Sequence, residues 1–335
     1  MTIAYSGDSI TYPDNSVQNT APKVGMVNRI INGAMVIDQR NAGASVTFND
    51  GVFAVDRFRC NANISNKCSA QRSTVAPTDF VNSLLVTSTS AYSVGAGEIM
   101  SFYQGVEGLN VSDLGWGTAN AQTVTLSFWV RSSLTGTFGG ALKNSASNRS
   151  YPFSYTISAA NTFEYKTITI AGDTSGTWLT TNGVGIYLQF GLGVGSTFSG
   201  PAGAWAAANL ISATGATSVV GTSGATFYIT GVQLEKGSTA TSFDYRPYGT
   251  ELQLCQRYYV IKNCVVTTSS IYQSIHLPVQ MRTYPTIPVT AFESGTGATF
   301  SSASTASVAV APSFVYQSAN HSTTAIASLA VSAEL

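Results

Sequence analysis

The stretch FYITGVQLEKGSTATSFDYRPYGTELQLCQRYY, residues 227–259, carries the strongest structural signal in the chain. Its first part belongs to an alternating segment from Thr226 to Glu235, which is typical of a β-strand. Tyr228, Thr230, Val232 and Leu234 would form one face, and Phe227 and Ile229 would make the other face apolar too. We therefore predict a strand that is covered on both faces, with a bulge or a close backbone approach at Gly231.

The second part of this stretch predicts a rigid joint between two β-domains. Arg246 precedes a proline and is therefore held extended, and Tyr248-Gly249 is expected to turn the chain. Carboxylates and guanidinium groups can pair here, and arginine stacked on tyrosine can fix the angle between domains. The predicted joint residues are Asp244, Arg246, Tyr248, Glu251, Arg257 and Tyr258. A ligand site at the joint is the alternative.

Short segments with one apolar face recur before this joint. The segment from Val124 to Arg131 places Leu126, Phe128 and Val130 on one face. The opposite face carries Thr125, Ser127, Trp129 and Arg131. The same alternation marks Val52 to Cys60, Phe163 to Ile170 and Val184 to Leu192. No segment longer than about ten residues has a helical period. The pattern predicts an all-β sandwich or barrel of antiparallel strands.

The composition narrows the class of partner. Only 10% of the 335 residues are charged, against about 25% in a typical soluble domain. Ser, Thr, Gly, Ala and Asn fill the gap, which suits β-structure and surfaces covered in an oligomer. The net charge is zero, and no Lys/Arg run exists to neutralise phosphates, so we expect no nucleic acid partner. No apolar run is long enough for membrane insertion, and residues 1–16 do not resemble a signal peptide.

Four segments together resemble one family. They are TYPDNSVQNTA (11–21), NRIINGAMVIDQRN (28–41), the stretch 227–259, and RTYPTIP (282–288). They resemble bacteriophage and prophage tail-fibre-like virion proteins that contain a carbohydrate-binding-module-like jelly roll. The resemblance implies a jelly-roll β-sandwich, with Ile30 to Gly33 in its first strand.

The resemblance also implies a domain order and an assembly. Residues 1–24 would form an arm that docks on other virion proteins or a sister subunit. Residues 25–250 would form the jelly roll, and residues 251–335 a smaller C-terminal β-domain for trimerisation or the distal tip. The Ser/Thr/Ala-rich tail after Arg282 is nearly uncharged, so we expect copies of the chain to cover it as a homotrimer. The protein would then be located in the virion, after assembly in the host cytoplasm.

No constellation of residues indicates catalysis. The sixteen acidic residues are scattered, and Asp113, Asp173 and Asp244 stand at turns, where aspartate normally has a structural role. No catalytic motif is present. We therefore expect no enzyme activity and no cofactor.

The cysteines and histidines do not indicate a metal site. Four cysteines form no CxxC pair, and two histidines stand at no ligand spacing. We expect no metal, and free buried thiols, with a Cys60–Cys68 disulfide as the alternative.

Sugar binding is the chemistry that the tryptophans favour, because aromatic faces stack on pyranose rings. Trp116 and Trp205 lie among small residues in expected loops, and they are the glycan-binding candidates because we expect their rings to be exposed platforms. For Trp205, packing within the domain is the alternative. Trp129 is expected to pack within the sandwich, and Trp178 to cap it.

Three functions remain after this reading. The first is a non-enzymatic virion fibre or appendage that adheres to a host-surface polysaccharide. The second is a purely structural head fibre, capsid decoration or baseplate adaptor. The third is a tail-associated glycan hydrolase whose carboxylates lie between subunits.

Overall fold

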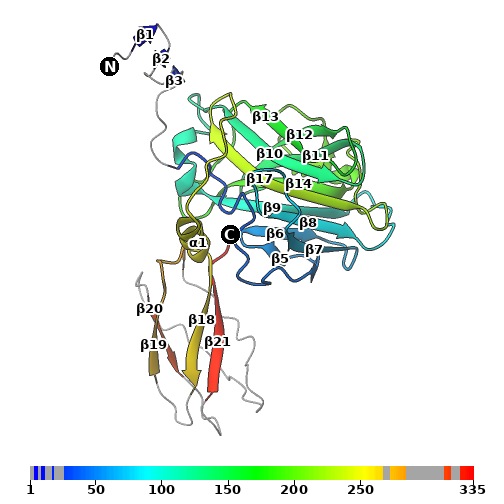
Figure 1. The fold of residues 1–335 in the computed structure, drawn as a ribbon. Helices are drawn as coiled ribbons and strands as arrows, with labels where there is room; N and C mark the ends of the chain where they lie inside the picture. The colour runs from blue at the N-terminus through cyan, green and yellow to red at the C-terminus, as the bar shows by residue number, and fades with distance from the viewer. Residues whose placement is uncertain are drawn as a thin grey trace.

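The protein is a β-sandwich from which a helix and two antiparallel pairs of strands continue (Figure 1). The structure, a computed structural model, describes residues 26–262, 276–283 and 330–335 with their side chains. It also describes the backbone of strands outside these ranges: β1 (Ala4–Ser6), β2 (Ser9–Thr11), β3 (Val17–Gln18), and the parts of β18 to β21 that lie beyond them.

Two six-stranded antiparallel sheets form the sandwich, which confirms the predicted jelly-roll class. The first, called the β10 sheet, has the order β13 (Glu164–Ile170), β10 (Val124–Ser132), β17 (Thr226–Lys236), β8 (Ser83–Ser88), β7 (Cys68–Ser73), β4 (Val46–Thr47). The second, called the β14 sheet, has the order β12 (Ser150–Ile157), β11 (Gly136–Lys143), β14 (Val184–Val194), β9 (Ile99–Glu107), β6 (Phe58–Ala62), β5 (Phe53–Val55). Short elements join them: η1 (Gly108–Asn110), η2 (Ser112–Leu114), η3 (Ser196–Phe198), β15 (Ser199–Gly200), β16 (Ser212–Ala213).

The core lies between the two sheets, as the alternation predicts. Leu126, Phe128 and Val130 of β10 are fully buried, and so are the inward residues of β14. The ring of Phe128 meets the ring of Phe190 edge-on at 5.2 Å, and Phe102 stacks on Phe190 at 5.3 Å. Such aromatic pairs add about 0.5–1.5 kcal/mol each to the burial of their apolar area.

Gly231 forms the predicted bulge in β17, and the bulge inverts part of the predicted face assignment. The pairing of β10 with β17 shifts register between Ser127 and Trp129, and Gly231 has φ +60°. The extra residue changes the phase of the strand. Phe227 and Ile229 face the core before the bulge, and Val232 and Leu234 face it afterwards. Our grouping of Tyr228 and Thr230 with Val232 and Leu234 on one face was therefore wrong.

Two segments that we predicted as single strands have other structures. Ile31 to Ala34 is a turn, and Asn32 has φ +60°. Its buried side chain explains the turn, because Nδ2 donates to the carbonyls of Ile37 and Asp56 at 2.8 Å and Oδ1 accepts from the Ile37 N–H. The segment from Val52 to Cys60 is a hairpin of β5 and β6 with Arg57 at φ +73°.

The joint differs from the expected turn as well. Tyr248-Gly249 begins helix α1 (Tyr248–Gln256) after Pro247, whose fixed φ suits a helix start. Beyond α1, β18 (Tyr259–Val266) pairs with β21 (Ala325–Ser332), and β19 (Tyr272–His276) pairs with β20 (Ser313–Gln317). These strand pairs extend away from the sandwich, and the C-terminus returns to it beside α1 (Figure 1). We keep the division at residues 24 and 250 as a proposal.

Three cysteines are free, buried thiols: Cys60, Cys68 and Cys255. Burial raises the pKa of each thiol, and the Cys68 pKa reaches about 12. The alternative of a Cys60–Cys68 disulfide is therefore wrong. The side chain of Cys264 lies outside the described residues.

We predict that Gly231→Ala destabilises the sandwich by about 1–3 kcal/mol, since a left-handed conformation is costly for a residue with a side chain. The new Cβ would lie 2.7 Å from Cζ of Phe80 and 3.2 Å from Cδ1 of Trp129. Gly249→Ala, where nothing lies within 4 Å of the added carbon, is the control. Denaturant unfolding measures both; equal stability of the two variants would contradict the bulge.

Candidate functional site

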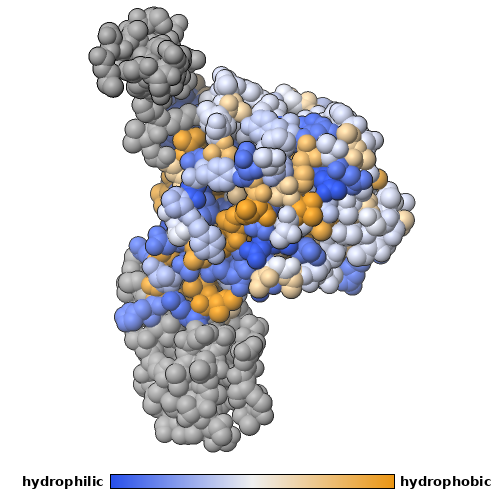
Figure 2. Space-filling model, in the orientation of Figure 1, coloured by the Kyte–Doolittle hydropathy of each residue, from blue (hydrophilic) through white to orange (hydrophobic). Residues whose placement is uncertain are grey.

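An aromatic pocket of about 510 Å³ lies on the outer face of the β10 sheet. Its floor is made by Ser127, Trp129 and Gly231, and one wall is the ring of Tyr165. The opposite wall comes from two loops, residues 78–80 between β7 and β8 and residues 240–245 after β17. Figure 2 shows apolar residues gathered among hydrophilic ones on the face of the sandwich turned to the viewer.

The floor follows from the period-2 alternation of the strands. Ser127 and Trp129 point away from the core because Leu126, Phe128 and Val130 point into it. In the neighbouring strand β13, Tyr165 is the direct partner of Trp129. Their ring centroids lie 5.4 Å apart, and Tyr165 is 44% exposed. The two strands thus present adjacent aromatic surfaces on the outside of the sheet.

The loop wall is a cluster of three rings. Phe80 lies 5.2 Å from Phe243 and 5.4 Å from Tyr245, and the last two lie 4.8 Å apart. Tyr245 is 54% exposed, and its hydroxyl donates to the carbonyl oxygen of Asp79. Partial burial and the nearby Asp79 charge raise the pKa of Tyr245, so its hydroxyl remains a donor at neutral pH.

Buried polar groups of β17 hold the loop that carries this wall. Glu235, fully buried, accepts from the Thr241 N–H at 2.8 Å and from the Thr241 hydroxyl at 2.7 Å. Gln233 donates to Glu235 at 2.9 Å, and its Oε1 accepts from the Asp244 N–H at 2.8 Å. Hydrogen bonds to a buried carboxylate are among the stronger ones. The loop is therefore fixed before any ligand arrives.

The chemistry of this pocket suits a neutral ring that carries hydroxyl groups. Half-exposed aromatic faces can stack on the apolar face of a pyranose, while hydroxyls and backbone groups orient its polar edge. Ser127, Thr241 and Ser242 supply hydroxyls, and Asp79 is the one charged side chain among the described lining residues.

The predicted glycan candidates Trp116 and Trp205 lie elsewhere, in an aromatic cluster with Trp178. Ring centroids in this cluster are 4.8 to 5.3 Å apart, in edge-to-face pairs. Each indole N–H donates to a backbone carbonyl: Trp116 to Gln122, Trp178 to Ser175, and Trp205 to Ala171. Trp116 is only 7% exposed, so our expectation of an exposed platform there was wrong. Trp205 is half-buried, and its ring also contacts Tyr151 at 5.2 Å.

The first half of the predicted joint ties the start of the sandwich to helix α1. Arg246 pairs with Glu251 at 3.1 Å and donates to the carbonyls of Asn28 and Ile30. Asp244 accepts from the N–H groups of Val27 and Asn28, both at 3.1 Å.

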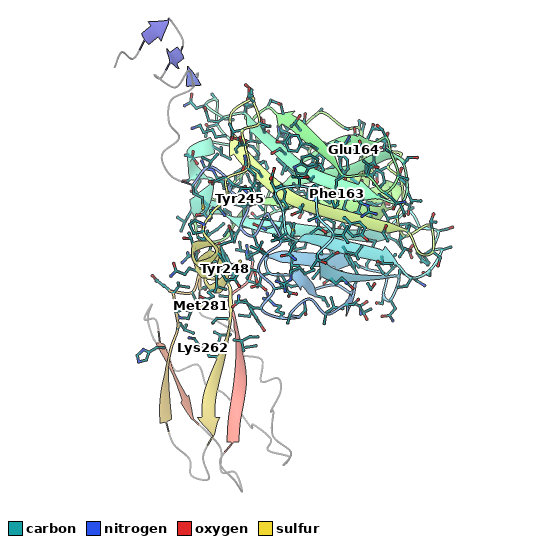
Figure 3. The ribbon with its side chains drawn as sticks, in the orientation of Figure 1. Phe163, Glu164, Tyr245, Tyr248, Lys262 and Met281 are labelled. Carbon is teal, nitrogen blue, oxygen red and sulfur yellow. The ribbon has the colours of Figure 1, made fainter. Side chains whose placement is uncertain are left out.

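The second half of the joint docks on β9. Arg257 makes two bonds to the buried Glu107, at 2.7 and 3.1 Å, and the Tyr258 hydroxyl donates to the same carboxylate at 2.8 Å. Burial raises the pKa of Tyr258 to about 12. Tyr248 differs from the others, because its side chain is 63% exposed at the start of α1 (Figure 3). The role of this segment as a rigid joint between domains stays a prediction.

The remaining turn aspartates also make structural contacts. Asp113 pairs with Arg29 at 2.9 Å, and Asp173, which is buried, makes two bonds to Arg149. Within the described ranges, no group of three His, Cys, Asp or Glu side chains could hold a metal ion. No helix of the described chain is long and apolar enough to span a bilayer.

Our sequence analysis missed the pocket because it assigned Trp129 to packing. The available signal was its phase, because Trp129 stands on the opposite face of its strand from three buried residues, Leu126, Phe128 and Val130. The loops that complete the pocket carry no signal of their own, since Phe80 and Phe243 meet only in the folded chain.

Comparisons with known proteins find similar solved structures at low sequence identity only. No family model matches the sequence, and no curated protein matches it. One similar structure is the enzymatically active domain of tailspike protein 4 from bacteriophage CBA120, at 12% identity and a TM-score of 0.36. That match covers 63% of this chain and 22% of the tailspike chain, so it spans only a fraction of the relative.

Two further similar structures come from bacteria. A putative sugar binding protein from Bacteroides thetaiotaomicron is 12% identical, with a TM-score of 0.37, over 63% of this chain and 100% of the other. The family 11 carbohydrate-binding module from Clostridium thermocellum, in complex with a mixed-linked tetrasaccharide, is 11% identical, with a TM-score of 0.30, over 60% and 100%. We therefore infer the ligand from the geometry of this chain alone.

Trp116→Ala should lower the free energy of unfolding by about 3–5 kcal/mol, as is usual for a large ring removed from a packed site. Trp116→Phe keeps part of the ring and loses the bond to Gln122, so its loss should be smaller. Thermal or denaturant unfolding measures both. A Trp116→Ala protein as stable as the wild type would show that the ring is not packed as described.

Proposed function

We propose that this protein is a non-enzymatic carbohydrate-binding appendage that contacts a polysaccharide at the pocket over the β10 sheet. The observation that carries the proposal is the pair Trp129 and Tyr165, side by side on the outer face of the sandwich and opposite a fixed loop wall. A hollow of about 510 Å³ has room for a pyranose ring between these walls. The hydroxyls on its rim match the polar edge of a sugar.

The presence of one carboxylate among the described lining residues of the pocket favours binding over hydrolysis. Glycosidases generally need two carboxyl groups that flank the scissile bond. Asp79 is the single acid among the described lining residues, and its backbone carbonyl already accepts from Tyr245.

The setting that we propose is a phage virion, with the protein as a fibre or appendage that adheres to a host-surface glycan. Support comes from the resemblance of residues 28–41 and 227–259 to tail-fibre-like proteins, and from a jelly-roll fold that suits it. Residues 1–24 would dock on other virion proteins, and residues 251–335 would hold a homotrimer. A structural head fibre, capsid decoration or baseplate adaptor is the second candidate, favoured by the rigid joint at Glu107 and Glu251.

Trp129→Ala and Tyr165→Ala should each weaken binding to host-cell polysaccharide about tenfold or more. Loss of a stacked ring costs on the order of 1.4 kcal/mol, which equals a tenfold change in Kd. Tyr248→Ala removes an exposed tyrosine that does not line the pocket, and it is the control. Glycan-array and cell-binding titrations measure the effect, with unfolding curves to verify the fold.

The outcomes separate the two candidate functions. If the folded Trp129→Ala protein binds as the wild type does, the pocket is not the glycan site. If the wild type binds no polysaccharide at all, the structural role is the better proposal.

The proposed homotrimer predicts a sedimenting species of three subunit masses at micromolar concentration. The driving force would be burial of the nearly uncharged C-terminal surface. Analytical ultracentrifugation of the full chain tests this, and a monomer across the concentration range would contradict it.

A further inference from the structure

A second, smaller hollow of about 160 Å³ lies on the outer face of the β14 sheet, on the opposite side of the sandwich from the aromatic pocket. Its lining side chains project outward from four adjacent strands, β6, β9, β14 and β11, and from the loop after β11. They are Asn61, Tyr103, Gln189, Tyr187, Lys143 and Ser147. We call this hollow the lysine cleft.

Lys143 is a buried cation without a counter-ion. The residue is 7% exposed, and its Nζ donates to Asn209 Oδ1 at 2.9 Å. The ring of Tyr187 lies 5.6 Å from Nζ, which gives a weak attraction. No carboxylate among the described residues pairs with it. Buried charges in folded proteins are normally paired, so a bound anion would stabilise this cation.

Gln189 adds an independent sign of a ligand. The residue is 2% exposed, and its Oε1 has no hydrogen-bond donor in the described chain. An unsatisfied buried acceptor costs about 1–3 kcal/mol. The cleft therefore holds one unused acceptor beside one uncompensated cation, which a ligand with both a hydroxyl donor and a negative charge would satisfy together.

The walls of the lysine cleft limit what can enter. Asn209 belongs to a loop that Ser150 anchors, through bonds to Ala208 and Leu210 at 2.7 and 3.1 Å. Among the lining residues, the rings of Tyr103 and Tyr187 meet edge-on at 5.2 Å. The space is that of a single sugar ring or a smaller group.

We propose that the lysine cleft binds the carboxylate of an acidic sugar residue, with Lys143 as the counter-ion and Gln189 Oε1 as acceptor for a ring hydroxyl. The choice of a sugar rests on the proposed function, while the choice of an anion rests on the buried cation alone. The site is separate from the aromatic pocket, whose lining suits a neutral ring. No covalent step is involved.

The groups around Lys143 give binding a defined pH dependence. Burial lowers the pKa of Lys143 to about 8, so the cation is largely present at pH 7 and largely lost at pH 9. Burial raises the pKa of Tyr103 from β9 and of Tyr187 from β14, so both stay neutral over this range. Arg59 of β6 donates to the Tyr103 hydroxyl and pairs with Asp50 at 3.5 Å. Asn209 and Ser147 do not titrate.

Calorimetric titration of the full chain with glucuronate, glucose and acetate tests the proposal at pH 7 and pH 9. Glucuronate should bind at least tenfold more tightly than either glucose or acetate at pH 7, and should lose about tenfold in affinity at pH 9. The comparison with glucose measures the contribution of the negative charge, and the comparison with acetate measures the contribution of the sugar ring. Two other acidic sugars, galacturonate and a sialic acid, are titrated in the same way as glucuronate.

Lys143→Met should abolish the preference for glucuronate over glucose and its pH dependence. The same variant should melt no lower than the wild type, because an uncompensated buried charge is removed. Gln189→Leu is the second variant, which should weaken glucuronate binding and leave acetate unchanged. Trp129→Ala should leave glucuronate binding intact, so failure of the aromatic pocket and failure of the lysine cleft are distinguishable.

Two results would overturn the inference. One is a wild-type protein that binds none of the acidic sugars at pH 7. The other is glucuronate binding that Lys143→Met and Gln189→Leu both leave unchanged.

Discussion

Strand β17 is the constraint on which the rest of the structure depends. It is central in its sheet, and its inward residues, from Phe227 to Leu234, are buried in the core. Its outward residues are buried as well, because Gln233 and Glu235 bind the loop that follows the strand. The bulge at Gly231 lies between the part of the strand that ends at Ile229 and the part that begins at Val232, and the absence of a side chain there leaves space for Phe80. One strand thus sets the core, the loop wall and the floor of the aromatic pocket.

Buried charged groups at the predicted joint attach the C-terminal segment to the sandwich. Glu107 receives Arg257 and the Tyr258 hydroxyl, and Arg57 stacks on the Tyr258 ring at 3.5 Å while pairing with Glu334. Removal of one partner from such a buried group leaves the others uncompensated and costs several kcal/mol. These contacts also hold the last residues of the chain against β9.

Much of this fold can be predicted from the sequence, but little of the two candidate sites can. Alternation identified β10, β13, β14 and β17, because each places one face in the core, and Gly231 marked the bulge. Face assignment beyond the bulge failed, since one inserted residue inverts every later side chain. Asn32 was read as strand because its hydrogen bonds to Ile37 and Asp56 exist only after folding. For the same reason the burial of Trp116, which depends on Trp178 and Trp205, has no local signature.

The two outer faces of the sandwich differ in the physics that each offers a ligand. Aromatic faces such as those of Trp129 and Tyr165 bind through apolar contact, which depends little on pH or salt. Lys143 offers a charge in a site of low exposure, where attraction to an anion is stronger than in water and vanishes when the amine loses its proton. A ring small enough for one hollow cannot reach the other, because two packed sheets about 10 Å apart separate them. A heteropolysaccharide with neutral and acidic residues would therefore meet each face through a different one of its sugars.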